Sequence, residues 1–265
     1  MLLYRRLLRS VATYGLRVAL MRSYQRLAKS LHNHGIGGTL SRALHPRPPV
    51  PPPTSERIHP FDLLHGTNTS GYILGSYLLS DTRSGAYTVA YYGISPSTLK
   101  QALTDLNIRY EEFTFVDIGC GKGRALLIAA MFPFRRLLGV DSSPELSAIA
   151  RANLATQPGA TERTTILTQD AATLVFPETP LVLFLYDPFL DQVLRRFLAN
   201  LERQLRRSPR ETYVLYAANP STETVARYPF LRQIYDIQIP MSAEDAAVDR
   251  HGLTHEHYTL YQSSL

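Results

Sequence analysis

The chain has 265 residues, of which 45% are hydrophobic and 19% charged, a composition typical of a globular protein with a sizeable core. The single cysteine, Cys120, excludes an intramolecular disulfide and argues against a structural zinc site, and no apolar stretch reaches the ~18 residues of a membrane-spanning helix. The net charge of +6 is unevenly divided, because residues 1–55 hold nine Arg or Lys and no acid, which leaves residues 56–265 with a net −3.

Residues 1–45 are predicted to form a basic helical arm, because apolar and basic side chains recur at helical spacing through residues 2–31. The apolar stripe consists of Leu3, Leu7, Val11, Tyr14, Val18, Met21, Tyr24 and Ala28. Such a helix can lie on an anionic membrane surface, or it can pack on the body or on a protein partner. The arginine-rich, acid-free N-terminus also resembles an organellar transit peptide. We expect a cytoplasmic protein, with membrane or protein contact through residues 1–31 as open alternatives.

Residues 46–55 are predicted to be a linker, since six of the eight residues from Pro46 to Pro53 are proline. Proline removes backbone donors and favours an extended, stiff spacer of about 3.1 Å per residue. A ligand for an SH3-type domain is the alternative interpretation. The linker leads into a body that spans residues 56–265.

The body alternates short apolar runs with helical patterns, starting from a helix predicted at Pro96–Leu106. Strands are predicted at Phe113–Ile118, Leu137–Val140, Thr165–Thr168, Leu181–Leu185 and Tyr213–Ala217, and helices at Gly123–Met131, Pro144–Leu154, from Leu190 to Leu205 and near Ser221–Tyr228. Gln233–Ile239 and His257–Gln262 are predicted to form an antiparallel hairpin joined by an acidic loop. This order predicts an α/β fold with a doubly wound, mostly parallel seven-stranded sheet and an antiparallel edge hairpin.

A glycine-rich loop follows the first predicted strand of the body, in the segment from Val116 to Arg124. Glycines at 119, 121 and 123 allow a tight turn and a close approach of backbone N–H groups to a ligand at the helix N-terminus. A phosphate-binding P-loop would need glycine at 116 and Ser or Thr at 123, and a dinucleotide fingerprint would need glycine at 124. The pattern is instead an acid, Asp117, followed by G-x-G-x-G.

This segment resembles the first motif of class I S-adenosylmethionine-dependent methyltransferases, and the resemblance extends from Phe113 to about Phe189 and more loosely to Gln262. It implies S-adenosylmethionine as cofactor, with Asp141 accepting both ribose hydroxyls and Asp170 holding the adenine amino group. The cofactor-binding residues that the resemblance implies are Asp117, Gly119, Cys120, Gly121, Lys122, Gly123, Asp141, Ser142, Asp170 and Ala171. Each acid also has a structural interpretation: Asp117 can orient the loop, Asp141 can cap a helix, and Asp170 can form a turn.

Asp187, Pro188 and Phe189 end the fourth predicted strand and resemble the (Asp/Asn)-Pro-Pro-(Tyr/Phe) motif of amine methyltransferases with one proline missing. The resemblance implies that Asp187 accepts a hydrogen bond from the target nitrogen and that Phe189 supplies an aromatic platform. Alternatively, Asp187 caps the next helix and Pro188 lies in its first turn. We expect methyl transfer to a nitrogen, with a protein lysine as the first candidate. An RNA or small-molecule methyltransferase and a non-catalytic, cofactor-binding adaptor that acts through the arm are the alternatives.

Three further groups of residues carry weaker signals. Tyr91 and Tyr92 are candidates for a lid over the cofactor or substrate, with a place in the core as the alternative. The cluster of His251, His255 and His257 with Asp249 and Glu256 matches no metal-ligand spacing, so we expect a solvated loop and no metal site. The arginines of the helix after Phe189 are expected on a solvated face, and the sequence gives no strong nucleic-acid signal.

Overall fold

The structure is a computed structural model that describes residues 58–75, 78, 90–188, 190–218 and 222–265. The predicted arm, the predicted linker and Phe189 lie outside these residues, so the predictions made for them stay predictions. Within the described residues, no helix is both long and apolar enough to cross a membrane.

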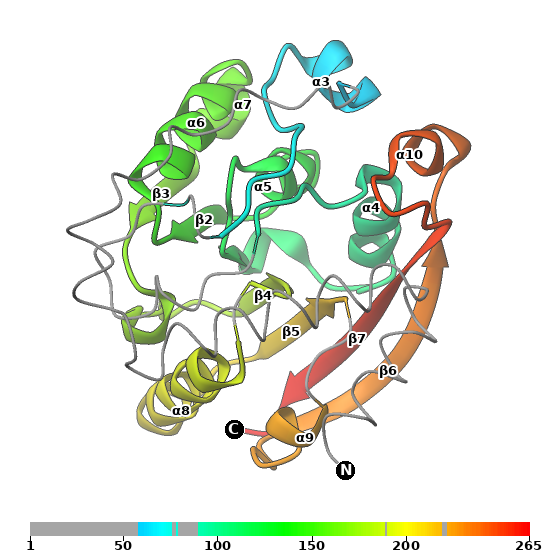
Figure 1. The fold of residues 1–265 in the computed structure, drawn as a ribbon. Helices are drawn as coiled ribbons and strands as arrows, with labels where there is room; N and C mark the ends of the chain where they lie inside the picture. Colours follow the sequence, from blue (N-terminus) through cyan, green and yellow to red (C-terminus); the bar gives the residue numbers. More distant parts are fainter. Residues whose placement is uncertain (1–57, 76–77, 79–89, 189, 219–221) are drawn as a thin grey trace, which may run out of the picture.

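The predicted α/β fold is confirmed (Figure 1). A single seven-stranded sheet has the strand order β3-β2-β1-β4-β5-β7-β6. The strands are β1 (Thr114–Ile118), β2 (Arg136–Asp141), β3 (Thr164–Thr168), β4 (Leu181–Tyr186), β5 (Thr212–Ala217), β6 (Leu231–Pro240) and β7 (His255–Ser263). The helices are α3 (Pro60–His65), α4 (Pro96–Thr104), α5 (Arg124–Ala129), α6 (Pro144–Ala155), α7 (Pro158–Thr161), α8 (Asp191–Arg207), α9 (Thr222–Val225) and α10 (Ala243–Val248), and the short 3-10 turns are η2 (Tyr110–Glu112) and η3 (Ala171–Thr173).

The five strands β3, β2, β1, β4 and β5 are parallel, and β7 runs antiparallel to both of its neighbours, β5 and β6. The chain order of the strands reverses between β1 and β4, because β2 and β3 continue the sheet on one side of β1 and β4 and β5 on the other. In such a sheet, the carboxyl ends of the two strands at the reversal leave a crevice between the loops that follow them. The glycine loop follows β1, and Asp187 follows β4, so both sequence motifs end at this crevice.

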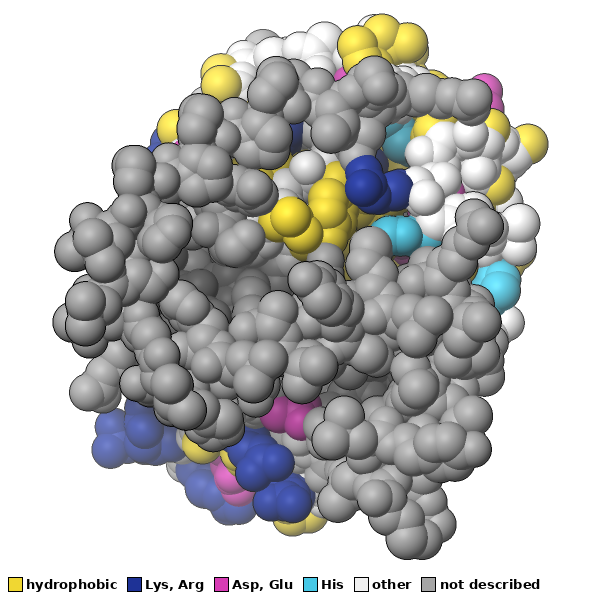
Figure 2. All heavy atoms as spheres, in the orientation of Figure 1, with side chains coloured by type: hydrophobic (Ala, Val, Ile, Leu, Met, Phe, Trp, Pro, Cys, Tyr) yellow, Lys and Arg dark blue, Asp and Glu magenta, His cyan; other side chains and the backbone are white. Residues whose placement is uncertain are grey.

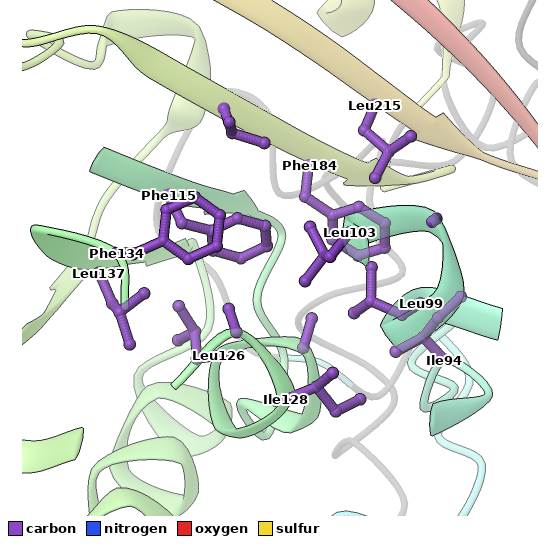
Figure 3. Close-up of a cluster of buried hydrophobic side chains, with 14 of the residues drawn as sticks. Ile94, Leu99, Leu103, Phe115, Leu126, Ile128, Phe134, Leu137, Phe184 and Leu215 are labelled. Carbon is purple, nitrogen blue, oxygen red and sulfur yellow. The ribbon is translucent and has the colours of Figure 1, made fainter. Parts of the chain in front are cut away.

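Side chains of the central strands alternate between two cores, one on each face of the sheet. Phe115 and Phe184 belong to the face covered by α4, α5 and α6, where they pack with Phe134 and Leu99 (Figure 3). The next residues along the same strands point to the other face, where Val116 packs with apolar residues of α8. Since both faces are covered, the parallel strands read as continuous apolar runs rather than as alternating patterns.

Several elements differ from the sequence predictions. The segment between the last two strands is not a simple acidic loop, because it contains α10, whose first turn is capped by the Ser242 hydroxyl accepting from Asp245 N at 3.1 Å. The helix predicted at Ser221–Tyr228 is shorter, and α9 ends at Val225. The helix after the glycine loop ends at Ala129, where the guanidinium of Arg163 donates to the carbonyls of Phe132 and Phe134 just beyond it.

The arginines of α8 lie on its exposed face, as predicted, while its apolar stripe is buried against the sheet. Figure 2 shows this group as a cluster of dark blue side chains in the region where Figure 1 draws α8. Arg206 forms an ion pair with Glu202 one turn earlier, at 2.7 Å, which is typical of a solvated helix surface.

Candidate active site

One cavity lies at the crevice between the carboxyl ends of β1 and β4 and contains most of the residues that the sequence motifs single out. It is lined by the glycine loop, by the ends of β2 and β4, by residues 169–171 after β3 and by residues 90–94. No group of three or more His, Cys, Asp or Glu side chains in the described part of the chain could hold a metal ion.

The glycine loop needs its glycines because other parts of the chain press against it. Gly119 and Gly121 both have positive φ, at 78° and 53°, a conformation that side chains with a Cβ rarely adopt. A Cβ on Gly119 would lie 2.6 Å from Pro188, and one on Gly121 would lie 2.5 Å from the Tyr91 ring. The loop therefore runs directly between the segment after β4 and the segment that contains Tyr91.

Asp141 is the last residue of β2, and its carboxylate contacts the backbone of the glycine loop. Its Oδ2 accepts a hydrogen bond from Gly121 N at 2.9 Å, and its Oδ1 accepts one from Ser143 N at 2.8 Å. Burial raises the pKa of Asp141, and hydrogen bonds from the backbone of Ser143, Gly121 and Ser142 oppose this shift. The alternative of a helix cap falls to Ser143, whose hydroxyl accepts from Leu146 N at 3.3 Å at the start of α6. Asp141 therefore does not cap α6 and lines the cavity.

Asp117 lies in β1 beneath the loop, and its carboxylate is incompletely paired. Only 3% of the residue is exposed, and among the described residues its Oδ2 has no hydrogen-bond partner. Burial raises its pKa well above the usual range, and the nearby Asp141 raises it further. Since buried polar atoms are nearly always paired, this oxygen fits a donor brought by a ligand, such as the ammonium group of an amino acid.

Residues 169–171 form the side of the cavity next to β3. Asp170 accepts from Ala172 N at 2.9 Å and so caps η3, which confirms its structural interpretation. Its other oxygen lies 3.4 Å from the guanidinium of Arg196 on α8, so this arginine has a role beyond the solvated face. Gln169, which sequence reasoning missed, also lines the cavity and donates its N–H to the Asp141 carbonyl at 2.9 Å.

A clamp around Asp62 holds the loop of residues 66–71 over α5. Five donors from Thr67, Thr69 and Ser70 reach the Asp62 carboxylate, at 2.5 to 2.9 Å. The buried guanidinium of Arg124 lies 4.0 Å from the same carboxylate and donates to the Thr69 hydroxyl at 2.7 Å. These hydrogen bonds lower the pKa of Asp62 although burial opposes them.

Tyr91 connects the clamp to the cavity. Its hydroxyl donates to the Thr69 carbonyl, and its backbone pairs with Ile73 in an isolated antiparallel bridge. The ring is buried, lines the cavity and covers Gly121. Tyr91 belongs to a small apolar cluster, as the core interpretation expects, and it also lines the cavity, while its role as a lid stays a prediction. Tyr92 lines the cavity too, and its hydroxyl donates to Asp249 at 2.8 Å.

Lys122 and Gly123 are the two implied cofactor residues that the structure does not place in the cavity wall. The Lys122 ammonium donates to the Ser70 carbonyl at 2.6 Å and to Asn68 at 3.3 Å, so it fastens the loop of the clamp instead. Gly123, with φ of 86°, starts α5 and packs against Ala150 of α6. The other implied cofactor residues, from Asp117 to Ala171, all line the cavity.

Asp187 and Pro188 form the wall at the end of β4. Asp187 has φ of 41°, an uncommon left-handed conformation for a residue with a side chain, and the Tyr216 hydroxyl donates to its Oδ1 at 3.3 Å. The alternative in which Pro188 occupies the first turn of the next helix is wrong, because α8 begins at Asp191 with Leu190 as its N-cap. Both residues face the cavity instead.

Comparison with known proteins agrees with this geometry. Residues 115–208, which run from β1 to the end of α8, match the family model of a methyltransferase domain. This match identifies residues 115–208 as a methyltransferase domain. No curated protein sequence matches the chain.

Several solved methyltransferase structures are similar to this domain at low sequence identity. Magnesium protoporphyrin IX methyltransferase from Synechocystis PCC 6803, solved with bound S-adenosylmethionine, is 13% identical, with a TM-score of 0.46, over 63% of this chain and 77% of that one. The glycopeptide N-methyltransferase MtfA is 13% identical, with a TM-score of 0.48, over 66% and 92%. Geranyl diphosphate C-methyltransferase from Streptomyces coelicolor is 14% identical, with a TM-score of 0.43, over 63% and 76%. At these scores the likenesses carry no argument about the acceptor.

The residues that line the cavity are chemically suited to bind S-adenosylmethionine, the cofactor of methyltransferases of this kind. The unpaired Asp117 oxygen suits the cofactor's ammonium group, and the Asp141 carboxylate retains acceptor capacity for ribose hydroxyls. Gly119 and Gly121 line the cavity and let Pro188 and the Tyr91 ring pack directly against the loop. Asp170 lines the cavity at its β3 side, and its contact with the adenine stays a prediction.

Proposed function

We propose that the methyltransferase domain transfers the methyl group of S-adenosylmethionine to an amine nitrogen, carried by a lysine side chain of a protein. The observation that supports this proposal most directly is Asp187, a carboxylate held at the cavity edge by a left-handed backbone. Left-handed residues with a Cβ persist where the surrounding structure fixes them, and they are common at functional sites.

The charges of the cavity wall favour a cationic acceptor. Asp117, Asp141, Asp170 and Asp187 line it, whereas Arg124, the one basic side chain among the lining residues that the structure describes, is engaged by the Asp62 clamp. An ammonium acceptor is attracted by such a wall, and a phosphodiester is repelled by it. This balance supports an amine over RNA among the alternatives.

The reaction asks little of the protein beyond alignment and desolvation. The cofactor supplies an electrophilic methyl group on a cationic sulfur. Asp187 would accept a hydrogen bond from the acceptor amine and direct the nitrogen lone pair toward that methyl. The Tyr216 hydroxyl, at 3.3 Å from Asp187 Oδ1, would keep the carboxylate oriented.

The experiment uses the full chain, S-adenosylmethionine with a tritiated methyl group, and three acceptor pools: a lysine-containing peptide library, total tRNA and free small amines. We expect label in the lysine peptides, and we expect Asp187→Ala to reduce it by about 100-fold. Asp105→Ala, an exposed carboxylate after α4, serves as the matched control and should leave transfer unchanged. Transfer only to tRNA or to small amines would overturn the lysine proposal, and cofactor binding without any transfer would support the adaptor alternative.

We further propose that residues 1–31 attach the protein to an anionic membrane surface. The proposal is supported by the acid-free, arginine-rich sequence of this arm. Flotation of the full chain with vesicles that contain phosphatidylserine should be lost when Arg5, Arg6 and Arg9 are replaced by glutamate. Equal flotation of both proteins would overturn it.

A further inference from the structure

Glu256 is a buried carboxylate next to the cavity, and the sequence analysis was wrong to place it in a solvated loop. It lies in β7, where only 4% of the residue is exposed. Thr98 of α4 donates its hydroxyl to Glu256 Oε2 at 2.7 Å, and Tyr186 of β4 donates to Oε1 at 3.0 Å. The two donors come from elements that lie far apart in the sequence, so spacing alone could not reveal this pair.

The groups that face Glu256 leave its carboxylate without an opposing charge among the contacts that the structure describes. Besides Thr98 and Tyr186, the Tyr258 hydroxyl lies 3.4 Å away and the Ser95 backbone donates to the carboxylate, while Asp249 adds a nearby negative charge. Burial raises the pKa of Glu256 to about 7, with the Asp249 charge in the same direction and the hydroxyl donors in the opposite one. Glu256 therefore changes its charge within the physiological pH range.

Tyr186 links Glu256 to the reacting end of the cavity. Its side chain lines the cavity, and the next residue is Asp187, which the proposed function assigns to the acceptor amine. Phe184, two residues earlier on the same face of β4, lines the cavity as well and packs in the core beneath it (Figure 3). Tyr186 thus lines the cavity and also contacts a buried carboxylate.

We propose that Glu256 is a positioning residue of the methyltransferase domain, which receives through the Tyr186 hydroxyl the proton that an acceptor ammonium must lose before methyl transfer. The inference rests on the proposed function. One N–H bond of the ammonium breaks and its electron pair stays on nitrogen. The released proton binds Tyr186 Oη, the proton already on Oη moves to Glu256 Oε1, and Tyr186 ends neutral with Glu256 protonated. A group that titrates near the working pH can accept this proton and return it to solvent.

The test needs no acceptor, because sinefungin carries an amine where S-adenosylmethionine carries its sulfonium methyl. Its affinity is compared with that of S-adenosylhomocysteine, which has an uncharged thioether at that position, by calorimetric titration of the full chain between about pH 5.5 and pH 8.5. If ionised Glu256 is coupled to the transfer site, the ratio of sinefungin to S-adenosylhomocysteine affinity should rise about fivefold as the pH passes 7. Groups common to both ligands cancel in this ratio.

Two variants and one matched control make the result specific. Glu256→Gln and Tyr186→Phe should each flatten the pH dependence of the ratio. Tyr213→Phe removes a second tyrosine–glutamate pair, in which Tyr213 donates to Glu211 at 2.8 Å on the surface, and it should leave the pH dependence intact.

The outcomes separate this inference from the proposed function. A ratio that stays constant with pH in the wild type, or that rises equally in Glu256→Gln, would overturn the role of Glu256 and leave lysine methylation standing. Equal losses of affinity for both ligands in the two variants would indicate a purely structural pair and would also overturn it. Failure of the wild type to bind either ligand would overturn the cofactor site and this inference together.

Discussion

Asp62 and Asp117 are equally buried, at 3% exposure each, yet their surroundings move their pKa values in opposite directions. Asp62 lies in the clamp above α5, where five donors and a guanidinium surround it. Asp117 lies beneath the glycine loop, where one of its oxygens is unpaired among the described residues and Asp141 is a neighbour of like charge.

The difference separates a fully paired carboxylate from one with an unpaired oxygen, which we propose receives a cationic ligand. The clamp stabilises the ionised form of Asp62, so its contribution to folding is present at neutral pH and is lost as the pH falls through its lowered pKa. The raised pKa of Asp117 has the opposite sign, so the folded state is penalised as the pH rises. A protein retains such a penalty where a cationic ligand can offset it.

The largest expected effect comes from breaking the clamp. Asp62→Ala should lower the free energy of unfolding by about 4 kcal/mol, because it leaves the buried Arg124 without its carboxylate. Urea unfolding at neutral pH measures this change. Thr67→Val, which removes a single donor to Asp62, should cost only about 1 kcal/mol. Similar losses in both variants would show that the clamp does not act as a unit.

Glu256 extends the comparison to pH. Its pKa is raised to about 7 from 4.5, so the folded state favours the protonated form, and this stability is lost as the pH rises from about 4.5 to 7. The free energy of unfolding of Glu256→Gln, relative to that of the wild type, should therefore rise by about 3 kcal/mol as the pH increases from 4 to 8. Urea unfolding of both proteins across this range would show a constant difference if Glu256 were exposed to water.

A substitution of Asp141 tests whether the carboxylates at the cavity bind the cofactor. Asp141→Ala should weaken S-adenosylhomocysteine binding by about 30-fold, which corresponds to about 2 kcal/mol for charged hydrogen bonds to ribose hydroxyls. Calorimetric titration of the full chain gives the affinity. Glu244→Ala, an exposed acid in the first turn of α10, is the control that should bind as wild type does. Unchanged affinity in Asp141→Ala would place the ribose elsewhere.

The smallest effect on stability is expected at Asp117. This variant tests the difference between Asp62 and Asp117 most directly. Asp117→Asn removes a buried charge, so the free energy of unfolding at pH 8 should be at least that of wild type, in contrast to Asp62→Ala. Cofactor affinity should fall about tenfold, because the ammonium group loses a charged acceptor. A loss of stability comparable with that of Asp62→Ala would make Asp117 a structural residue.

Local sequence patterns were sufficient to predict the sheet and most of the residues that line the cavity. The alternation of apolar runs and helical patterns fixes the order of the elements, and the G-x-G-x-G loop follows its strand directly. Asp141, Asp170 and Asp187 each end or follow a strand, and parallel strands bring their carboxyl ends to one edge. Their convergence thus follows from the topology.

Other features depended on contacts between distant segments. Lys122 belongs to the glycine motif, yet its ammonium donates to the Ser70 carbonyl and the residue does not line the cavity. Glu256 stands among histidines in the sequence, yet it is buried against Thr98 and Tyr186 because β7 pairs with β5. Neither placement is encoded in spacing along one element.

The sequence by itself determined the class of fold, the cofactor loop and the acids at the strand ends, because these depend on backbone periodicity and on short-range geometry. The tertiary structure decided which carboxylates are paired and which are left to a ligand. That distinction depends on donors supplied by remote parts of the chain and on burial, and both exist only once the sheet and its helices have packed together.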